Sequence, residues 1–524
     1  MSVRIEFGNG QSRLYAPEEV IKAVRYYVSY QEIALPPRGV QVALREYFSR
    51  NMRIGGLGDV IVACQDPAVQ AQMAANEFDP EDLTVRMLET TIRNAQVWDG
   101  WKSMVSDRGV FGSGLLHHVT RVLDLRLGTR YLVQDCRGTR PEPKQLIRPP
   151  TLRDYQQAAV DACLAEGRGV LDLPPRSGKT RIALALLCHL GMRAVVIAPN
   201  VGIAKQTVGK FRAHLPDGIV ALGTGGKQSA RKARRMNEAM ILVATPGTFL
   251  KVPGVRSRQV VVVDEFHHAA AETWQKINRE TPTAWWRFGL TGTHFRADGK
   301  GMAMAAVLGR AIYRQTVTDI VVRGHLSPAR IAMVRVRGDS PAHDPRANAW
   351  YAAGVVENEA RNRTLAWAAR QLIARGRKVL CIVKEVRHGE LIQQLIPGSV
   401  FVSGEDNKGK VDVDRIDETL GRLQTGEIPC VIGTSVIGEG RDVPAADALV
   451  YFAGLKSRVK VTQDYYRVLT PSPGKKYGII IDAADCHHGV LTSHAAERLL
   501  LYRSERAFEA DVMEWDSLES WLDR

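Results

Sequence analysis

Short apolar runs rich in β-branched residues alternate with longer segments of helical periodicity along the chain after residue 150. The first series of runs comprises Gly169–Leu173, Ala194–Ala198, Ile241–Ala244, Val260–Val263 and Phe288–Leu290. The second series comprises Lys378–Val383, Ser399–Val402, Cys430–Gly433, Ala448–Phe452 and Gly478–Ile481. Strands that alternate with helices are typical of a parallel sheet with crossover helices. The pattern therefore predicts an α/β fold with two parallel-sheet domains in tandem.

The chain before residue 150 is less periodic and ends in a proline-rich stretch, Arg140–Pro150, which is typical of a linker. A chain of 524 residues is too long for a single core. We predict a small mixed α+β N-terminal region, the two sheet domains and a C-terminal helical segment. The predicted boundaries are 1–85 for an accessory region, 86–149 for a small substrate-recognition domain with the linker, 150–325 and 326–484 for the two α/β domains, and 485–524 for the helical segment.

The composition is that of an ordinary globular protein, with 45% hydrophobic and 24% charged residues. No uncharged apolar run reaches the ~18 residues that a membrane span needs. The first ten residues lack the pattern of a secretory signal. The seven cysteines are scattered without a Cys-x-x-Cys pair, which favours reduced thiols. We therefore expect a cytoplasmic protein that does not enter a membrane.

The formal net charge of +15 is unevenly distributed. Between Ile203 and Val260 there are eleven Lys or Arg residues against two acids, Asp217 and Glu238. Such a surface attracts a phosphate backbone. A merely soluble basic face is the alternative for a single cluster, but this one lies beside the motifs described next. The cluster that we expect to contact nucleic acid is Arg231, Lys232, Arg234 and Arg235.

The segment Leu171–Thr180 follows the first predicted strand, opens an apolar helix and ends in Gly-Lys-Thr. A strand–loop–helix of this kind holds phosphate groups with backbone N–H groups and the helix N-terminus. Lys179 would reach the outer phosphates of ATP, and the Thr180 hydroxyl would bind Mg²⁺. The match to the full motif is incomplete, because Leu173 replaces the first glycine and Arg176 stands where a glycine is more usual. The other nucleotide-binding positions of the loop are Ser177 and Gly178.

A second segment, Val261–His268, is an apolar strand that ends in two carboxylates. The carboxyl edge of an open parallel sheet is where such folds bind ligands. Asp264 would hold Mg²⁺, and Glu265 would polarise the attacking water. Together with the Gly-Lys-Thr segment, this strand predicts an ATPase.

The ordered motifs resemble those of the DExH branch of superfamily 2 helicases over residues 150–482. This resemblance implies two RecA-like domains that bind ATP and move along nucleic acid. In the Q motif (Leu152–Gln157) and motif II (Asp264–His267) it implies that Arg153, Gln156 and His267 contact the nucleotide. Gly440 and Asp442 of the motif V segment Gly433–Pro444 are implied in the same role. The strand-contacting residues that it implies are Pro199, Asn200, Lys205, Gln206, Thr245, Pro246, Gly247, Thr434 and Ser435.

Within the superfamily, the segment Ser457–Gln463 is similar to that of the group that contains XPB and UvsW. The segments Trp98–Lys102 and Gly112–Leu116 are similar to an upstream small domain that contacts duplex DNA in this group. Core packing of Trp98 and Trp101 explains these aromatic residues equally well. We therefore expect duplex or branched DNA as the partner, recognised in part by residues 86–149.

Motif VI departs from the family pattern Gln-x-x-Gly-Arg-x-x-Arg. Gln463 and Arg467 are retained as catalytic candidates, but Tyr466 replaces the glycine and Thr470 replaces the last arginine. The resemblance makes that arginine the finger that neutralises charge on the transferred phosphate, worth ~10³-fold or more in rate. Arg467 alone could perform this role, or a neighbouring cation could replace the finger. The neighbouring cations are Lys456, Arg458 and Lys460.

These motifs predict an ATP-dependent DNA helicase or translocase that unwinds, branch-migrates or reanneals DNA, with ATP and Mg²⁺ as cofactors. One alternative is an ATP-gated DNA-binding switch with little turnover. A second alternative is a subunit of a larger DNA-processing complex in which a protein partner supplies the missing arginine. An RNA helicase is a third alternative, because the motor motifs alone do not distinguish the two nucleic acids.

Overall fold

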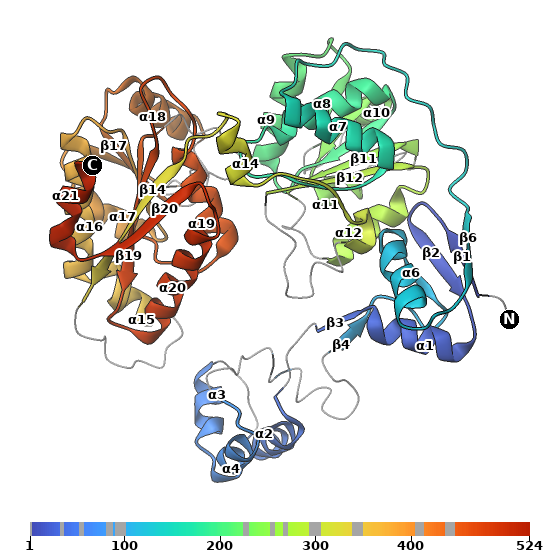
Figure 1. The fold of residues 1–524 in the computed structure, drawn as a ribbon, viewed down its shortest axis with the longest axis horizontal. Coiled ribbons are helices and arrows are strands. Elements are labelled where there is room, and N and C mark those ends of the chain that lie inside the picture. Colours follow the sequence, from blue (N-terminus) through green and yellow to red (C-terminus); the bar gives the residue numbers. More distant parts are fainter. Residues whose placement is uncertain are drawn as a thin grey trace. The chain divides into compact units, whose positions relative to one another are not determined.

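The computed structural model describes residues 3–31, 36–51, 57–79, 87, 89, 101–223, 230–251, 257–265, 271–292, 305–337, 349–403, 413–434 and 446–524. It divides into two compact units. The first comprises Met1–Leu173 and Gly178–Arg314, and the second comprises Pro174–Ser177 and Gln315–Arg524. In Figure 1 the first unit is coloured from blue to yellow-green, and the second, apart from Pro174–Ser177, from yellow to red. Among the described residues, no helix combines the length and the apolar character that crossing a bilayer requires.

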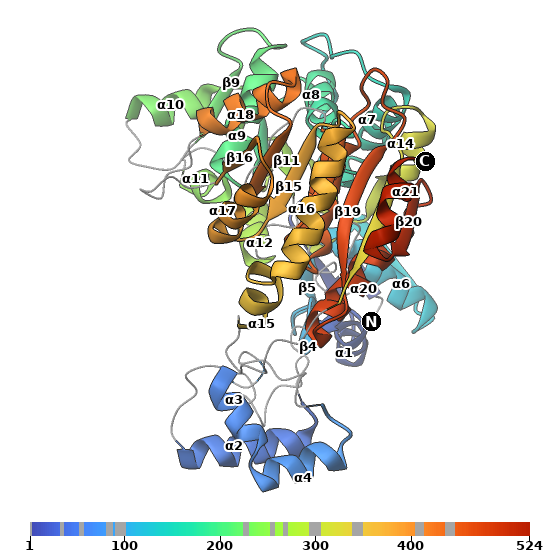
Figure 2. The same ribbon diagram turned by 90° about the vertical axis from the view of Figure 1, so that its left-hand side faces the viewer.

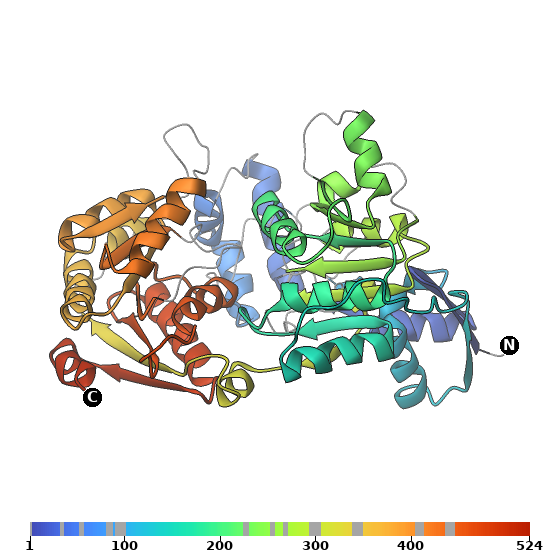
Figure 3. The same cartoon turned by 90° about the horizontal axis from the view of Figure 1, so that it is seen from above.

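The main sheet of the first unit has seven parallel strands in the order β13-β7-β12-β11-β8-β10-β9. The strands are β7 (Arg168–Asp172), β8 (Ala194–Ile197), β9 (Val220–Gly223), β10 (Ile241–Ala244), β11 (Val260–Asp264), β12 (Trp286–Thr291) and β13 (Ala311–Arg314). The accompanying helices are α7 (Asp154–Glu166), α8 (Lys179–Leu190), α9 (Val201–Arg212), α10 (Ala230–Glu238), α11 (Pro246–Phe249) and α12 (Ala271–Glu280). Helices cover both faces of this sheet, which is green in Figure 3.

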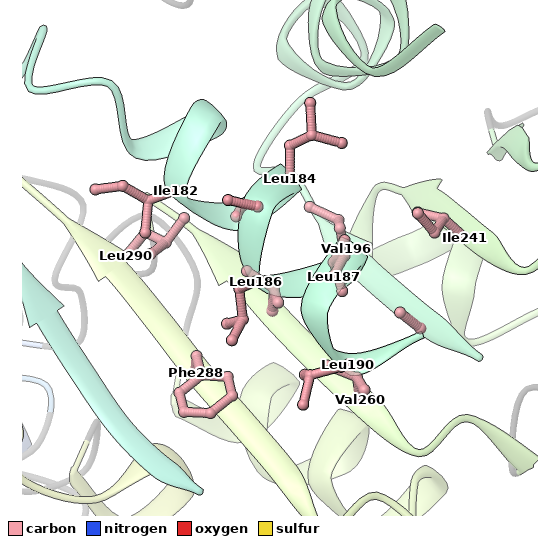
Figure 4. Close-up of a cluster of buried hydrophobic side chains, with 14 of the residues drawn as sticks. Ile182, Leu184, Leu186, Leu187, Leu190, Val196, Ile241, Val260, Phe288 and Leu290 are labelled. Atoms are coloured by element: carbon pink, nitrogen blue, oxygen red, sulfur yellow. The ribbon is translucent and has the colours of Figure 1, made fainter. Parts of the chain in front are cut away.

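The apolar runs of the strands are explained by burial on both faces of the sheet. In β11, Val260 and Val262 join one core cluster, whereas Val261 and Val263 join another. Successive side chains of a strand point to opposite faces, so a strand covered on both sides must be apolar throughout. Figure 4 shows the first of these clusters, in which leucines of α8 meet Phe288 and Leu290 of β12.

The N-terminal part of the first unit is built around a mixed sheet in the order β5-β2-β1-β6. Its strands are β1 (Val3–Phe7), β2 (Gln11–Tyr15), β5 (Val110–Gly112) and β6 (Tyr131–Asp135). β1 is parallel to β6 and antiparallel to β2. The helices α1 (Glu18–Tyr27) and α6 (Leu116–Leu125) accompany it, with η2 (Ser113–Leu115) before α6. One sheet therefore takes strands from both sides of the boundary that we drew between residues 85 and 86.

Among the described residues between β3 (Ser29–Gln31) and β4 (Trp101–Ser103), which pair with each other, three helices have defined bounds. They are α2 (Arg38–Asn51), α3 (Leu57–Cys64) and α4 (Pro67–Ala75). These helices pack around a core of their own that includes Val40, Leu44, Phe48 and Val69. The helical group is therefore an insertion into the N-terminal sheet domain.

The N-terminal sheet domain packs closely on the main sheet domain of the same unit. Ala305 and Ala306, which precede β13, belong to the N-terminal core. A Cβ atom on Gly114 would lie 1.9 Å from the carbonyl oxygen of Ala305, so only glycine allows this approach. The Asn278 amide donates to the Gly10 carbonyl at 2.8 Å across the same junction. The glycines of Gly112–Leu116, which suggested a DNA-contacting domain, thus have a packing role.

The second unit also has a sheet of seven parallel strands, in the order β16-β17-β15-β18-β19-β14-β20. The strands are β14 (Ala329–Val336), β15 (Val379–Val383), β16 (Ser399–Val402), β17 (Cys430–Thr434), β18 (Ala448–Tyr451), β19 (Gly478–Asp485) and β20 (Phe508–Met513). The helices are α14 (Val317–Val322), α15 (Ala349–Tyr351), α16 (Glu359–Ala374), α17 (Val386–Leu395), α18 (Val413–Thr425), α19 (Arg458–Tyr465), α20 (Gly489–Arg503) and α21 (Leu518–Leu522), with single turns η5 (Ala352–Val356), η7 (Tyr466–Val468) and η8 (Trp515–Ser517). α16 crosses one face of the sheet (Figure 2).

We predicted a helical segment over residues 485–524, but the structure has a strand within this segment. β20 lies between α20 and α21 and pairs in parallel with β14 over Ala329–Val334. The segment is therefore divided into two helices and an edge strand, with the single turn η8 before the last helix. Leu518 and Trp521 of α21 then close the core on the side of α16.

A buried ionic network joins three elements of the second unit. The Arg361 guanidinium of α16 lies 2.8 Å from the Asp485 carboxylate of β19, and Arg498 of α20 lies 2.7 Å from Asp482. Both arginines are almost fully buried, at 0% and 1% exposure. The Tyr502 hydroxyl donates to Asp482 at 3.0 Å. Removing one partner of such a pair leaves an uncompensated buried charge.

We expect Asp482→Ala to lower the free energy of unfolding by ~3–5 kcal/mol, because Arg498 then stays buried without its main carboxylate. Denaturant unfolding of the purified chain measures this change. The matched control is Asp516→Ala, which removes an exposed carboxylate of η8. It should change the free energy by less than ~0.5 kcal/mol. Equal effects of the two substitutions would contradict a structural role for the network.

Candidate active site

The loop after β7 opens directly into α8, as the Gly-Lys-Thr segment predicts. Gly178 caps this helix in the left-handed conformation, with a φ of 84°. Leu173, at the position of the missing first glycine, is fully buried, and its N–H donates to the Thr291 carbonyl at 2.9 Å. The leucine thus anchors the start of the loop in the core. In the first turn of α8 the N–H groups of Arg181 and Ile182 donate to the Gly178 carbonyl at 2.8 and 3.0 Å. Those of Lys179 and Thr180 are the ones that this helix N-terminus can offer to an anion.

Lys179 and Glu265 meet where β7 and β11 end. The Lys179 ammonium lies 2.9 Å from the Glu265 carboxylate, and the two side chains are 9% and 17% exposed. The same ammonium donates to the Leu173 carbonyl at 3.5 Å. Charges that are this close and this well shielded from water interact more strongly than a surface pair does. The sequence expectation that these two residues share one site agrees with this geometry.

Asp264 precedes Glu265 and accepts a hydrogen bond from its backbone N–H at 3.0 Å. Burial, and then the neighbouring Glu265 charge, raise the pKa of Asp264 to about 6. Glu265 itself has a φ of 43°, which a residue with a side chain rarely adopts. Backbone outliers of this kind concentrate at active sites, where the surroundings hold them. The carboxylate pair is therefore held in a conformation that the chain would not adopt by itself.

Gln156 lies against the same loop. A Cβ atom on Gly178 would come within 2.3 Å of the Gln156 amide nitrogen. The Gln156 side chain is 3% exposed, and its oxygen accepts from the Arg153 backbone N–H at 3.0 Å. Arg153 is exposed just before α7. Gln156, which the resemblance implies contacts the nucleotide, is thus adjacent to the predicted phosphate loop.

The residues expected to contact a strand follow β8 and β10, which are neighbours in the sheet. Asn200 caps α9 by accepting from the Ile203 N–H at 2.9 Å, directly after Pro199. On the same helix Lys205 is exposed and Gln206 is half-buried. The second group precedes or begins α11 and comprises Thr245, Pro246 and Gly247. Both groups therefore lie at the carboxyl edge of the sheet.

The basic cluster lies on α10. Arg234 and Arg235 are exposed, and Arg234 forms an ion pair with Glu238 at 2.7 Å. Only the backbone of Arg231 and Lys232 is described. The cluster therefore presents at least two guanidinium groups to solvent.

Motif VI forms the end of α19 and the turn η7 in the second unit. Arg467 is 3% exposed and donates to the Asp464 carboxylate at 3.0 Å. Tyr466, at the position of the family glycine, is buried and stacks on Tyr465 with ring centroids 5.0 Å apart. Gln463 is half-buried on α19. The tyrosine thus fills the core instead of leaving the space of a glycine.

Several predicted site residues lie outside the described part of the chain. They are His267, Ser435, Gly440 and Asp442. Trp98 also lies there, and Trp101 is described only as a backbone position in β4. Thr434 is the last residue of β17 and is buried.

Sequence reasoning missed the ion pair beneath the loop. Asp172 ends β7 with a side chain that is 2% exposed, and Arg314 of the neighbouring β13 lies 2.9 Å from it. The available signal was a carboxylate at the end of an apolar strand, just before the phosphate loop, because a buried carboxylate needs a partner. Its partner could not be found from sequence, because β13 is far along the chain.

Three comparisons with known proteins agree with these motifs. A family model described as "Type III restriction enzyme, res subunit" matches residues 150–296. The DNA 3'-5' translocase XPB2 of Sulfurisphaera tokodaii is 22% identical over 361 residues, which cover 61% of this chain and 78% of the relative. The DNA 3'-5' helicase XPB of Mycobacterium tuberculosis is 28% identical over 189 residues, or 35% of this chain and 34% of the relative.

A solved structure supports the fold. The ATP-dependent Type ISP restriction-modification enzyme LlaBIII, bound to DNA, has 16% sequence identity and a TM-score of 0.51. The match covers 72% of this chain and 32% of that chain. The chain has two RecA-like domains preceded by a small mixed region, and the predicted fold class is confirmed.

The chain is thus similar to proteins named as DNA helicases or translocases. The relatives named XPB belong to the group whose resemblance the motifs indicated. These similarities agree with that resemblance.

We expect Gly178→Ala to weaken ATP binding by more than ~10-fold, because the new methyl group would meet Gln156 and the φ of 84° disfavours a side chain. Titration with a fluorescent ATP analogue measures the affinity. The matched control is Gly209→Ala on α9, where no atom lies within 4 Å of the added Cβ. That control should bind the analogue normally and gain up to ~1 kcal/mol in stability. Undiminished binding by Gly178→Ala would contradict the site.

Proposed function

We propose that this chain is an ATP-dependent DNA helicase or translocase that acts on duplex or branched DNA. The observation that carries the proposal is the Lys179–Glu265 ion pair at the carboxyl edge of the first sheet. A lysine that reaches phosphates and a carboxylate that activates water are the two groups that nucleotide hydrolysis needs in one place.

The residues of the loop would act in sequence. Without nucleotide, Glu265 neutralises Lys179. When ATP binds, its phosphates replace Glu265 as the partner of the Lys179 ammonium. The Glu265 carboxylate can then orient water and accept its proton. The full set that we propose for the nucleotide is Arg153, Gln156, Ser177, Gly178, Lys179, Thr180, Asp264, Glu265, His267, Gly440, Asp442, Gln463 and Arg467.

Mg²⁺ fits the oxygen donors of Asp264 and Thr180. Hard cations of this size prefer carboxylate and hydroxyl oxygens together with phosphate. The raised pKa of Asp264 reflects a buried carboxylate with too little positive charge around it, which a cation would correct. When bound, Mg²⁺ neutralises charge on the phosphates that are split.

The partner that we propose is DNA held along the carboxyl edges of the sheets. The first domain would contribute α9, α11 and the basic helix α10, and the second would contribute Thr434 and Ser435. Both relatives described above are named for action on DNA. The N-terminal sheet domain and its inserted helices α2–α4 would select the structure of the DNA.

A switch with little turnover is not favoured, because the hydrolytic pair Lys179 and Glu265 is retained in full. A larger complex in which a partner supplies an arginine remains a second candidate. Its motivation is Thr470 at the position of the family's last motif VI arginine. ATPase activity that appears only after a partner is added would favour it.

We expect ATP hydrolysis by the purified chain to be stimulated by duplex or forked DNA. Lys179→Ala should lower the rate at least ~100-fold by removing the phosphate-contacting charge. Glu265→Gln should lower turnover by ~10²–10⁴-fold and keep nucleotide binding, because only proton acceptance is lost. Steady-state assays with duplex, forked and single-stranded DNA and with RNA measure both effects. Absence of turnover with every nucleic acid would contradict the proposal, and stimulation by RNA alone would reassign the substrate.

We expect Arg234→Ala to weaken DNA binding by ~3–10-fold and to lower the slope of log affinity against log salt by about 1, because one phosphate contact is lost. The matched control is Arg363→Ala on α16, because both arginines are exposed and form i,i+4 ion pairs with glutamate. Fluorescence anisotropy at several salt concentrations measures the slope. An equal change in both variants would show that α10 has no special role.

A further inference from the structure

Two departures from the helicase motifs are reciprocal. Arg176 occupies a glycine position of the phosphate loop, and Thr470 occupies the last arginine position of motif VI. We propose that Arg176 is a catalytic residue that supplies, from within the phosphate loop, the guanidinium that motif VI has lost. The inference rests on the proposed ATPase function and assigns one step of it to a particular side chain.

The backbone at Arg176 supports a role for its side chain. Its φ is 63°, in the left-handed region that favours glycine. Among the described residues only Glu77 and Glu265 share this feature without being glycine, and Glu265 belongs to the active site. A side chain in this region is energetically unfavourable. A glycine would fit the loop better, so the arginine is present despite the conformation and not because of it.

The side chain of Arg176 is directed toward the motif VI position. The structure groups Pro174–Ser177 with the C-terminal unit. Within that unit the half-buried Arg176 guanidinium donates a hydrogen bond to the Thr470 hydroxyl. The two exchanged positions are thus direct partners. A second arginine at position 470 would place two like charges next to each other, so an arginine at 176 disfavours one at 470.

The other cations near motif VI are less suited to this role. Arg467 is buried and its guanidinium is held by Asp464 at 3.0 Å, with both side chains 4% exposed. Lys456, Arg458 and Lys460 are exposed around the start of α19. Arg176, by contrast, is three positions before Lys179, inside the loop that surrounds the phosphates.

The chemistry requires a cation at this place. During hydrolysis the water oxygen bonds to the γ-phosphorus, and its proton passes to the Glu265 carboxylate. The bond from phosphorus to the bridging oxygen breaks, and its electron pair leaves with ADP. Negative charge therefore grows on the bridging and γ-phosphate oxygens. The planar guanidinium fork of Arg176 can contact two such oxygens at once. Thr470 would hold the same group when no nucleotide is bound.

Three variants test this assignment by a reciprocal exchange: Arg176→Gly, Thr470→Arg, and the two combined. We expect R176G to lower kcat for DNA-stimulated ATP hydrolysis by ~10²–10³-fold, as loss of an arginine finger does. Its Kd for a fluorescent ATP analogue should stay within about threefold, and its Tm should be unchanged or higher, because the strained backbone is relieved. The double variant should recover kcat to within ~10-fold of the wild type, since the guanidinium returns from the family position.

The matched control is Arg181→Ala, which removes an exposed arginine of α8 whose guanidinium donates to the Thr151 carbonyl at 2.8 Å. Its kcat should be that of the wild type. Arg176→Asn, which also tolerates the left-handed backbone, repeats the loss without glycine's flexibility. The inference is overturned if R176G keeps the wild-type kcat. It is also overturned if both R176G and R176N lose nucleotide binding in proportion to kcat. A wild-type chain without turnover would instead refute the proposed function.

Discussion

The ion pair between Lys179 and Glu265 depends on the parallel arrangement of the first sheet. β7 and β11 are separated by β12 alone, and all three run in the same direction. The segments that follow β7 and β11 therefore emerge at one edge, although they are far apart along the chain. Opposite charges shielded from water at that edge are costly unless they meet. The pair thus fixes the loop before α8 against the end of β11, and Gln156 of the same unit lies against this loop.

The N-terminal sheet domain extends the first RecA-like domain as part of the same compact unit. The approach of Gly114 to Ala305 leaves no space for a side chain, and the Ala305–Ala306 segment leads directly into β13. An N-terminal region that selects the substrate would then move together with the first RecA-like domain. In the second unit Arg361 connects separate segments in the same way. It donates to the Asp485 carboxylate and, at 2.8 Å, to the Phe452 carbonyl, which precedes motif VI in the chain.

Apolar periodicity predicted the two parallel sheets well, because a strand buried on both faces must be apolar at every position. It missed β9 and β13 at the two edges of the first sheet. It also missed β14 and β20 of the second sheet, whose sequences mix charged and apolar residues. Arg330 and Arg335 interrupt β14, and β20 carries Glu509 and Asp511 at the sheet edge. The N-terminal region was divided in sequence order, whereas β1 pairs with β6 across the inserted helices α2–α4. Such pairing depends on distant partners, which a local pattern does not contain.

The sequence by itself determined the fold class and indicated the candidate residues of the phosphate loop, because these depend on residue types at short, fixed spacings. Only the tertiary structure decided which groups meet. It placed Gln156 against Gly178, engaged Arg467 with Asp464 and directed Arg176 to Thr470. From sequence alone, Arg176 and Thr470 were two unrelated departures from two motifs. The reason is physical: a motif specifies local backbone geometry, whereas the partner of a long charged side chain is set by packing between segments distant in the chain.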